Sequence, residues 1–348
     1  MKINRQELLN ILNYCRPGLA VREIIEEAVR FIFTGKEVTT FNDKVCIIAP
    51  FETDFACSVH GEEFYKILSS IKEDEVDIEV VDNQMKINAK KTKAGLSTII
   101  GEKERVIGLI ANLQTSTKKK GFWKKLPEDF IKGIYLCMFS ASKDMTTGVR
   151  CCVAVKGDKI YSTDNLRISK YLLSSETEEM LIPARDAAEL VKYDVKKYGI
   201  SNGWIHFITN EGVMFNCRTM VGDYPFGTIS KFFREPENEL IIPMEMKEVM
   251  KAAAVVAEGD VEIAKTVEVT IEKGKILCKS EDKGKKWMIK EVDFPEYEGD
   301  KVLFYVNPGF FAQVLDKSTS LFLVQGEELP DKAVFTNENF QHLLALPV

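Results

Sequence analysis

The stretch VHGEEFYKIL at residues 59–68 decides the architecture, because a segment built in the same way returns twice along the chain. The later copies are LIPARDAAELVKY at 181–193 and YVNPGFFAQVLDK at 305–317. In each copy a short extended lead-in ends in a turn-forming residue, and an amphipathic helical pattern follows it. The same order of signals at three places indicates an internal repeat.

Spacing and the strands that follow each helix both support the repeat. Phe64 and Ala187 are 123 positions apart, and Ala187 and Phe311 are 124 positions apart. Each helix is followed by a strand, a turn and a second strand, with alternating apolar residues typical of half-buried antiparallel pairs. The three pairs read EVDIEVV-DNQ-MKINAKK, WIHFIT-NEG-VMFNCRT and TSLFLVQ-GEELPD-KAVFTN, and the middle helical pattern AAELVKYDVKKYG precedes the second.

Another set of helices precedes these units at a similar interval. Their apolar residues have helical spacing, and they begin with Asn or Pro plus acidic residues, as helix starts do. They lie at 3–15, 126–138 and 242–256. We therefore predict an α+β chain of three repeated domains, each with two helices and about eight short antiparallel strands. Charged, turn-rich segments near 118–125 and 233–240 divide it into domains at 1–120, 121–236 and 237–348.

Composition bounds the class of protein. The 348 residues exceed one ordinary core, and 45% hydrophobic with 29% charged residues is typical of a globular chain. The sequence has neither a membrane-spanning apolar run nor the apolar core of a signal peptide, so we expect a cytoplasmic protein. Eight cysteines without a C-x-x-C pair, and only three histidines, predict no metal and no cofactor. The net charge of −6 leaves room for one basic face.

Repeated sheets of this kind have an edge problem. An isolated sheet exposes unpaired edge strands, and joining each domain to the next by its edge removes all but the two outer ones. Head-to-tail association of two chains removes those as well, because six domains rotated by about 60° each close a ring. All the helices would then lie on one wall of the ring.

Four local motifs resemble the bacterial DNA sliding clamp family, the beta subunit of DNA polymerase III. KGDKIYSTDNLRIS (156–169) is similar to the family's acidic turn, strand and A-T-D-G-H-R-L-A, with Thr163, Asp164 and Arg167 on its Thr, Asp and Arg. LIPARDAAELVK resembles V-P-R-K-G-V-I-E-L, VGDYPFGTIS resembles D-G-R-F-P-D-Y-R-R-V, and LLALPV resembles V-V-M-P-M-R-L. The resemblance covers the whole chain. Asn165 and Leu166 replace the family's Gly-His, which indicates a divergent member from a phage or a low-GC bacterium.

The resemblance implies a non-catalytic processivity factor of DNA replication. Such a homodimeric ring encircles duplex DNA without reading its sequence and tethers the replicative polymerase. Basic residues on or beside the two helix families are the candidates for facing DNA, although each fits an ordinary solvated helix surface equally well. They are Arg5, Arg22, Lys66, Lys132, Arg185, Lys192, Lys247 and Lys251. Lys196 and Lys197 extend the basic run of the middle helix.

Two protein contacts also follow from the resemblance. The family binds short peptides of polymerases and the clamp loader in an apolar groove, although Ile168 and Leu344 also fit a plain core. The groove residues carried over by motif are Thr163, Leu166, Arg167, Ile168, Pro225, Ile229, Leu344, Leu346, Pro347 and Val348. At the subunit contact we expect Ile107 and Leu109 of one chain to face Val255 and Val256 of the other, although the two valines also fit a helix core.

Two other classes of protein stay open at this point. An enzyme needs a site, and the sequence contains no G-x-S-x-G, P-loop, H-E-x-x-H or G-x-G-x-x-G motif. His206 and Cys217 are near in sequence, but a pair of neighbouring strands explains both. A ring-shaped or repeat scaffold that binds only protein is the alternative, and it would lack a positive inner wall.

Overall fold

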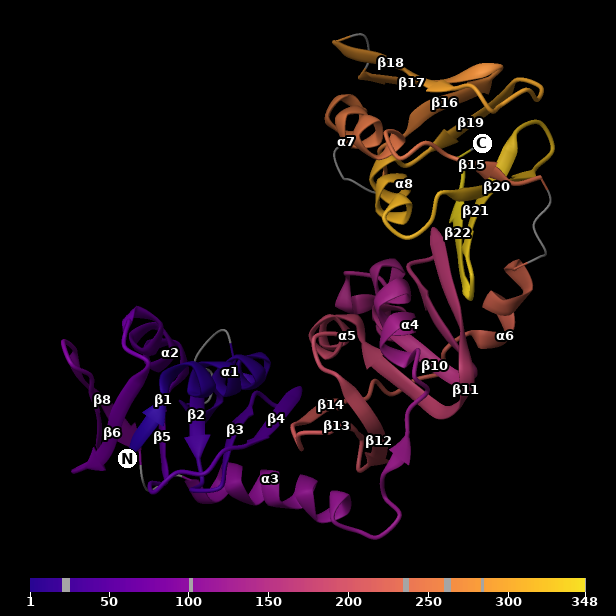
Figure 1. Cartoon of the computed structure of the whole chain (residues 1–348). Helices are drawn as coiled ribbons and strands as arrows, with labels where there is room; N and C mark the ends of the chain where they lie inside the picture. Colours follow the sequence, from indigo (N-terminus) through magenta and orange to yellow (C-terminus); the bar gives the residue numbers. More distant parts are fainter. Residues whose placement is uncertain (21–25, 100–102, 234–237, 260–263, 283–284, 348) are drawn as a thin grey trace. The chain divides into compact units, whose positions relative to one another are not determined.

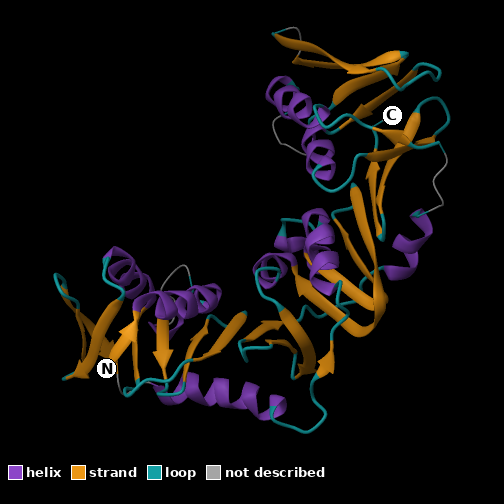
Figure 2. Cartoon of the chain, viewed as in Figure 1, coloured by secondary structure: helices purple, strands orange, loops and turns teal. Residues whose placement is uncertain are grey.

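The computed structural model describes residues 1–20, 26–99, 103–233, 238–259, 264–282 and 285–347. The chain packs as two compact units. The first unit is Met1–Ile131 with Arg185–Met220, and the second is Lys132–Ala184 with Val221–Val348. Each unit combines helices with antiparallel sheets (Figure 1, Figure 2), which confirms the predicted α+β class.

One sheet of twelve strands forms the first unit. Strands β4 and β14 pair within it, with Cys46 opposite Asn216, so the sheet continues from an early part of the sequence into a much later one. In order across the sheet the strands are β1 (Lys2–Asn4), β6 (Glu75–Val81), β7 (Gln84–Asn88), β8 (Lys93–Ile99), β5 (Cys57–His60), β2 (Arg30–Phe33), β3 (Glu37–Phe41), β4 (Val45–Pro50), β14 (Met214–Arg218), β13 (Trp204–Thr209), β12 (Val195–Ser201) and β9 (Lys124–Lys125).

Two-residue turns explain why the hairpins of this sheet form where they do. Asp82 and Asn83 join β6 to β7 with φ of 51° and 59°, and Asn202 and Gly203 join β12 to β13 with φ of 50° and 77°. Positive φ at both positions matches the twist of antiparallel strands, and Asn, Asp and Gly adopt it most readily. The predicted hairpins β6–β7 and β13–β14 are confirmed.

The described residues of the second unit form two sheets. In the six-stranded sheet β11 pairs with β22, so this sheet also joins distant parts of the sequence. Its order is β10 (Cys152–Thr163), β11 (Arg167–Pro183), β22 (Phe340–Ala345), β21 (Pro330–Asn337), β20 (Ser320–Gln325) and β15 (Leu240–Ile241). The predicted third hairpin is β20–β21. The four-stranded sheet has the order β18 (Lys286–Phe294), β17 (Gly274–Asp282), β16 (Val267–Glu272) and β19 (Val302–Val306).

Both predicted helix families are confirmed. The first comprises α1 (Arg5–Cys15), α4 (Phe130–Cys137) and α7 (Met246–Val256), and the second comprises α2 (Gly61–Ser70), α5 (Ala184–Leu190) and α8 (Pro308–Leu315). The turn-forming residues act as N-caps. Asn4 Oδ1 accepts a hydrogen bond from Glu7 N at 3.0 Å, and Asn307 Oδ1 accepts one from Phe310 N at 2.9 Å.

The middle helix is shorter than predicted. It ends at Leu190, and the residues DVKKYG that continued its pattern enter strand β12 instead. Lys196 and Lys197 therefore do not extend a helical basic run, because they lie on β12 beside β13 and β9. The turn at Asn202–Gly203 pairs this segment with Trp204–Thr209, and tertiary pairing outweighs its local helical pattern.

Among the helices that the structure describes, α3 (Lys103–Thr117) and α6 (Phe226–Ile229) have no counterpart in the predicted repeat. Ile110 and Leu113 of α3 pack against Ile48 and Trp204 of the twelve-stranded sheet. Helix α1 contacts β3 and β4, and Figure 1 shows α1 and α2 on the opposite side of that sheet from α3. Helices on both faces explain why five successive residues of β4 are buried.

Candidate partner-binding and nucleic-acid interfaces

The segment with the best match to the expected peptide groove is a tight turn between β10 and β11. Asp164 Oδ1 accepts hydrogen bonds from the backbone N of Leu166 and of Arg167, both at 3.1 Å. Thr163 Oγ1 donates to the Arg167 carbonyl at 2.7 Å, and Asn165 takes the left-handed conformation with φ of 78°. Short polar side chains thus replace the missing backbone pairs, and they fix the shape of this turn.

Arg167 anchors the turn to helix α8. Its guanidinium is 3% exposed, with Nε 2.9 Å from Asp164 Oδ2 and Nη1 donating to Gln313 Oε1 at 2.7 Å. It also lies 4.1 Å from the centre of the Phe310 ring. Burial lowers the pKa of Arg167, and the Asp164 carboxylate opposes that shift. A group held on three sides in this way positions its neighbours and is not free to meet solvent.

The last strand of the chain completes this region. Leu344 of β22 pairs with Arg167, and the backbone N of Ala345 donates to the Leu166 carbonyl at 2.8 Å. Leu344 and Leu346 belong to the hydrophobic core, and Ile168 is buried as well. Ile168 and Leu344 are therefore core residues, which is the alternative that the sequence left open for them. Leu346 is a core residue as well.

Helix α6 packs against the same hairpin. The Phe226 ring lies 6.0 Å from the Tyr161 ring of β10, centre to centre, and Ile229 is buried. Pro225, which precedes the helix, is exposed. The contact between Phe226 and Tyr161 thus holds α6 against the β10–β11 hairpin, which carries Thr163.

Only some of the expected groove residues offer surface to a partner. Leu166, Pro225 and Pro347 are exposed, whereas the other described members are buried. Val348 lies outside the described residues. The structure thus brings the turn and β22 into direct contact, and the apolar side chains that remain available are those of Leu166 and the two prolines.

Carboxylates neutralise four of the basic residues expected to face DNA. The four ion pairs join Lys132 to Glu338, Lys192 to Glu189 and Lys251 to Glu248, each at 2.7 Å, and Lys247 to Asp316. Arg5 Nε donates to the Glu73 carbonyl at 2.9 Å. Lys66 on α2 and Arg185 on α5 are exposed, and Arg22 lies outside the described residues. Paired lysines attract phosphates weakly, because the neighbouring carboxylates oppose them.

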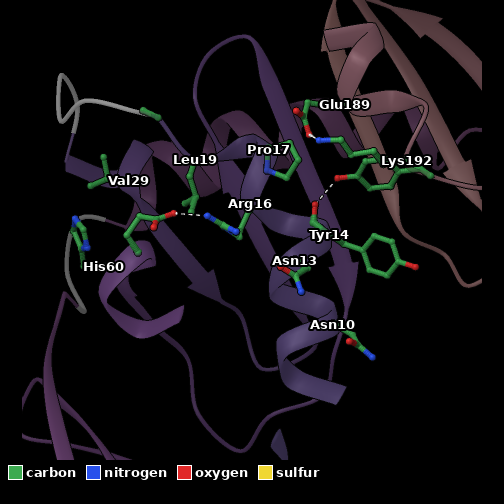
Figure 3. Close-up of a pocket in the computed structure, with 13 residues that line it drawn as sticks. Asn10, Asn13, Tyr14, Arg16, Pro17, Leu19, Val29, His60, Glu189 and Lys192 are labelled. Carbon is green, nitrogen blue, oxygen red and sulfur yellow. Dashed lines mark hydrogen bonds and ion pairs between the residues drawn. The ribbon is translucent and has the colours of Figure 1, made fainter. Parts of the chain in front are cut away.

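Sequence reasoning missed a cleft of ≈ 960 Å³ in the first unit. Figure 3 shows Asn10, Asn13 and Tyr14 projecting from α1 at this cleft, with Lys192 opposite. The Tyr14 side chain is 42% exposed, and its ring centre lies 5.6 Å from that of Tyr193, whose hydroxyl donates to the Tyr14 carbonyl. The cleft thus combines one exposed aromatic ring with side-chain amides and ion-paired residues.

A helical-face argument would have found the exposed tyrosine at this cleft. The buried face of α1 is formed by Leu8, Leu9, Leu12 and Cys15. Tyr14 falls outside that stripe, so an exposed aromatic residue was predictable from spacing alone. On the far side of the cleft, Arg16 Nη2 lies 3.1 Å from Glu62 Oε1.

The residues expected at the subunit contact are described in part. Val255 at the end of α7 is 76% exposed, and Val256 is half-buried. The exposed Val255 therefore does not belong to a helix core. Ile107 and Leu109 lie on α3, but their side chains are outside the described part of the structure. Two more exposed apolar residues, Trp287 and Ile289, lie on the edge strand β18.

Metal and membrane chemistry find no support in the described residues. No group of three or more His, Cys, Asp or Glu side chains among them could hold a metal ion. No described helix is long and apolar enough to cross a bilayer.

Comparison with known proteins identifies the fold. No protein-family model matches the sequence, and no curated protein sequence matches it. Solved structures match along the whole chain. The beta subunit of the DNA polymerase of Streptococcus pyogenes superposes with a TM-score of 0.80 at 17% identity, covering 99% of both chains. The DNA polymerase III beta chain of Streptococcus pneumoniae gives 0.80 at 18% identity, covering 100% of this chain and 99% of that one. The DNA polymerase sliding clamp of Bacillus subtilis gives 0.76 at 16% identity, covering 100% and 98%. The predicted clamp fold is confirmed.

Proposed function

We propose that this chain is a DNA sliding clamp, two copies of which close into a ring around duplex DNA and tether a replicative polymerase. The observation that carries the proposal is the match to DNA polymerase beta subunits over 99% of both chains with a TM-score of 0.80. The protein would act in the cytoplasm as a processivity factor. It would need no catalytic residue, cofactor or metal, because its effect is topological.

The proposal includes the three-domain division at 1–120, 121–236 and 237–348. Two helices recur in each part, and the second helix of each is followed by consecutive strands. These strands are β6–β7–β8 after α2, β12–β13–β14 after α5 and β20–β21–β22 after α8. Three copies of one supersecondary order support three copies of one domain.

Repetition also suggests how two chains join. Within the chain, the third strand after the second helix pairs with a strand of the preceding repeat. β14 pairs with β4, and β22 pairs with β11. The corresponding strand of the first repeat is β8, which pairs with β7 and meets β5 only at Thr98 and Ile99. Strand β18 ends the four-stranded sheet. We infer that β18 of one chain pairs with β8 of the other, which would close the ring at two equal contacts.

The exposed apolar residues fit this contact. Trp287 and Ile289 alternate on β18 and so point to one face of the sheet. They would be buried against the partner chain, with Val255 of α7 beside the expected Ile107 and Leu109 of the partner. Apolar residues exposed on an edge strand usually mark such an interface.

DNA would be held weakly by charge and firmly by closure. Lys66 and Arg185 are the clearest candidates to meet phosphates, with the ion-paired Lys132, Lys192, Lys247 and Lys251 contributing less. The net charge of −6 supports low affinity for DNA that has not been threaded through a ring. The ion pairs of these four lysines reduce the positive charge of the helices. They therefore also favour the alternative, a protein-binding scaffold without a DNA role.

The polymerase and clamp loader would dock by short peptides near the β10–β11 turn. Leu166, Pro225 and Pro347 offer the apolar surface, and Thr163, Asp164 and Arg167 hold the turn that presents it. Leu166 in place of the family's histidine makes this surface more apolar.

A threading experiment tests the proposal. The protein is mixed with linear duplex DNA, the ends are blocked with streptavidin, and the mixture is filtered at high salt. A clamp stays on end-blocked DNA and leaves when a restriction enzyme cuts it, because only topology resists salt. Open-ended DNA of the same sequence is the control. Equal retention on both DNAs would show ordinary binding, and retention on neither would favour the scaffold.

A further inference from the structure

A groove in the second unit lies away from the residues expected to bind the polymerase. It is bounded by β15, the segment that leads into α7 and the loop that follows β18, and it has a volume of ≈ 890 Å³. Ile242 and Phe294 are buried there, whereas Ile241 and Met244 are each 57% exposed. Strand β15 ends its sheet, so its outer backbone groups have no neighbouring strand among the described residues.

The rim of this groove is acidic. Among the groove's described lining residues are four carboxylates and no lysine or arginine. Glu239 accepts a hydrogen bond from Ser320 Oγ. Among the residues that the structure describes, Glu245, Asp293 and Glu296 have no cationic partner. Uncompensated carboxylates around apolar side chains repel nucleic acid and attract a cation that carries an apolar group.

In the first unit, a cation of the chain itself lies beside the strand that has the same place in the order of elements. Strand β1 precedes α1 and pairs with β6, as β15 precedes α7 and pairs with β20. Beside β1, the amino nitrogen of Met1 lies 3.2 Å from Asp77 Oδ1 and 3.6 Å from Asp54 Oδ2, and the Met1 sulfur accepts from Asp54 N at 3.4 Å. Asp54 lies shortly after β4. Asp293 is the last residue but one of β18, and Glu296 lies shortly after that strand.

We propose that this groove binds a segment of a partner protein in which lysine or arginine flanks an aliphatic side chain. The aliphatic group would cover Ile241 and Met244, and the cations would meet Asp293, Glu296 and Glu245. The outer edge of β15 would offer backbone hydrogen bonds to an extended segment. The site is separate from the polymerase-binding residues, and it does not depend on the proposed role in replication.

Peptide binding measured by fluorescence anisotropy tests the assignment. The probe is a labelled, acetylated octapeptide of alternating lysine and leucine. We expect saturable binding that the double variant Asp293→Lys, Glu296→Lys weakens at least about tenfold, and that Met244→Ser weakens several-fold. All three positions are exposed, so circular dichroism should show unchanged folding.

Matched controls separate the groove from general charge. Glu327→Lys with Glu328→Lys changes the net charge equally on an exposed loop of the same unit, and it should leave binding unchanged. A lysine–serine octapeptide should bind more weakly, and a glutamate–leucine octapeptide should not bind. The proposal is overturned if the two double variants weaken binding equally, or if the lysine–leucine peptide shows no saturable binding. It is also overturned if sedimentation shows that Glu296→Lys alone, at a position beyond the end of β18, dissociates the protein, since the groove would then hold a second copy of the chain.

Discussion

Among the described strands, the two pairs that are most distant in sequence are β4–β14 and β11–β22, and these two junctions are built differently. At β4–β14, His206 Nδ1 donates to Asn216 Oδ1 at 2.7 Å, and Ser201 Oγ donates to His206 Nε2 at 2.9 Å. Asn216 Nδ2 then donates to the Cys46 carbonyl of β4 at 2.8 Å. Every polar atom of this chain of hydrogen bonds has a partner, so it fixes the register of both strands.

The β11–β22 junction also buries a histidine but leaves it half-satisfied. His342 Nδ1 lies 2.9 Å from Ser169 Oγ and 3.3 Å from Ser140 Oγ, while Nε2 has no hydrogen-bond partner among the described residues. The ring stacks on Phe139 at 5.0 Å. Packing and the buried Arg167 stabilise the β11–β22 junction, whereas a network of hydrogen bonds stabilises the β4–β14 junction. The lesson is that one repeated strand pairing can be stabilised by different chemistry.

The largest effect is expected from Arg167→Ala. It leaves Asp164 nearly buried without its cation and empties the space over Phe310, so unfolding should become easier by about 3–5 kcal/mol. Arg218→Ala is the matched control at the other junction, because Arg218 pairs with Asp43 at 2.8 Å with both side chains well exposed. It should change stability by less than about 1 kcal/mol. Urea denaturation of both variants measures the difference, and similar losses would contradict it.

A third junction, the one proposed between chains, is tested by Trp287→Glu with Ile289→Glu. Removing two apolar side chains from the contact should weaken the dimer about 100-fold, or about 3 kcal/mol, without changing the fold of the monomer. Sedimentation over a range of concentrations gives the dissociation constant. Val221→Glu, at a side chain 90% exposed elsewhere, is the control. An undisturbed dimer in the double variant would exclude β18 from the interface.

Replacing each histidine by phenylalanine separates the two designs directly. His206→Phe removes the hydrogen bonds of Asn216 Oδ1 and Ser201 Oγ and should destabilise the protein by about 2 kcal/mol. His342→Phe removes an unpaired buried nitrogen and adds apolar contact with Phe139. It also loses the contacts of Nδ1 with Ser169 and Ser140, but these two hydroxyls keep their hydrogen bond to each other at 2.7 Å, so stability should change by less than about 1 kcal/mol. Thermal unfolding of the two variants at neutral pH is the measurement. The reverse order would refute the distinction.

The pH dependence of stability should be a smaller signal with a defined sign. Burial lowers the pKa of His206 and of His342 below the ordinary 6.5. As the pH falls below 6.5, these histidines take up protons in the unfolded chain while they stay neutral in the folded one. The free energy of unfolding should therefore fall with decreasing pH, by up to about 1.4 kcal/mol per pH unit for each histidine. Each His→Phe variant should lose its own share of the slope. Burial raises the pKa of Asp186 to about 6, so its contribution to the slope has the opposite sign. All variants retain Asp186, so its contribution cancels when their slopes are compared. Unchanged slopes in both variants would disprove the linkage.

Local signals predicted much of this fold. Asp82–Asn83 marked a turn, Asn4 and Asn307 marked helix starts, and alternating residues marked the strands that follow. The predictions failed where distant residues decide the outcome. The DVKKYG segment continues a helical pattern but pairs as β12, and α3 is stabilised by side chains of β4 and β13 that no local window contains.

The candidate sites were predictable to a smaller degree. The motif located Thr163 and Arg167, yet it could not show that Arg167 is buried by Gln313 and Phe310 from elsewhere in the sequence. Likewise, the count of lysines could not show that Glu338 and Asp316 neutralise Lys132 and Lys247. The residue types can be read from the sequence. Whether a side chain is buried, and whether an ion pair offsets its charge, depends on partners from distant parts of the chain.

The pairing of β4 with β14 has a consequence for the nascent chain during translation. Cys46 and Asn216 are about 170 residues apart, so translation at about 5–20 residues per second leaves β4 uncovered for roughly 10 to 30 s. A nascent chain would carry an open apolar edge throughout that interval, a recognised route to misassembly. The fate of β4 during that interval should therefore affect the yield of folded protein.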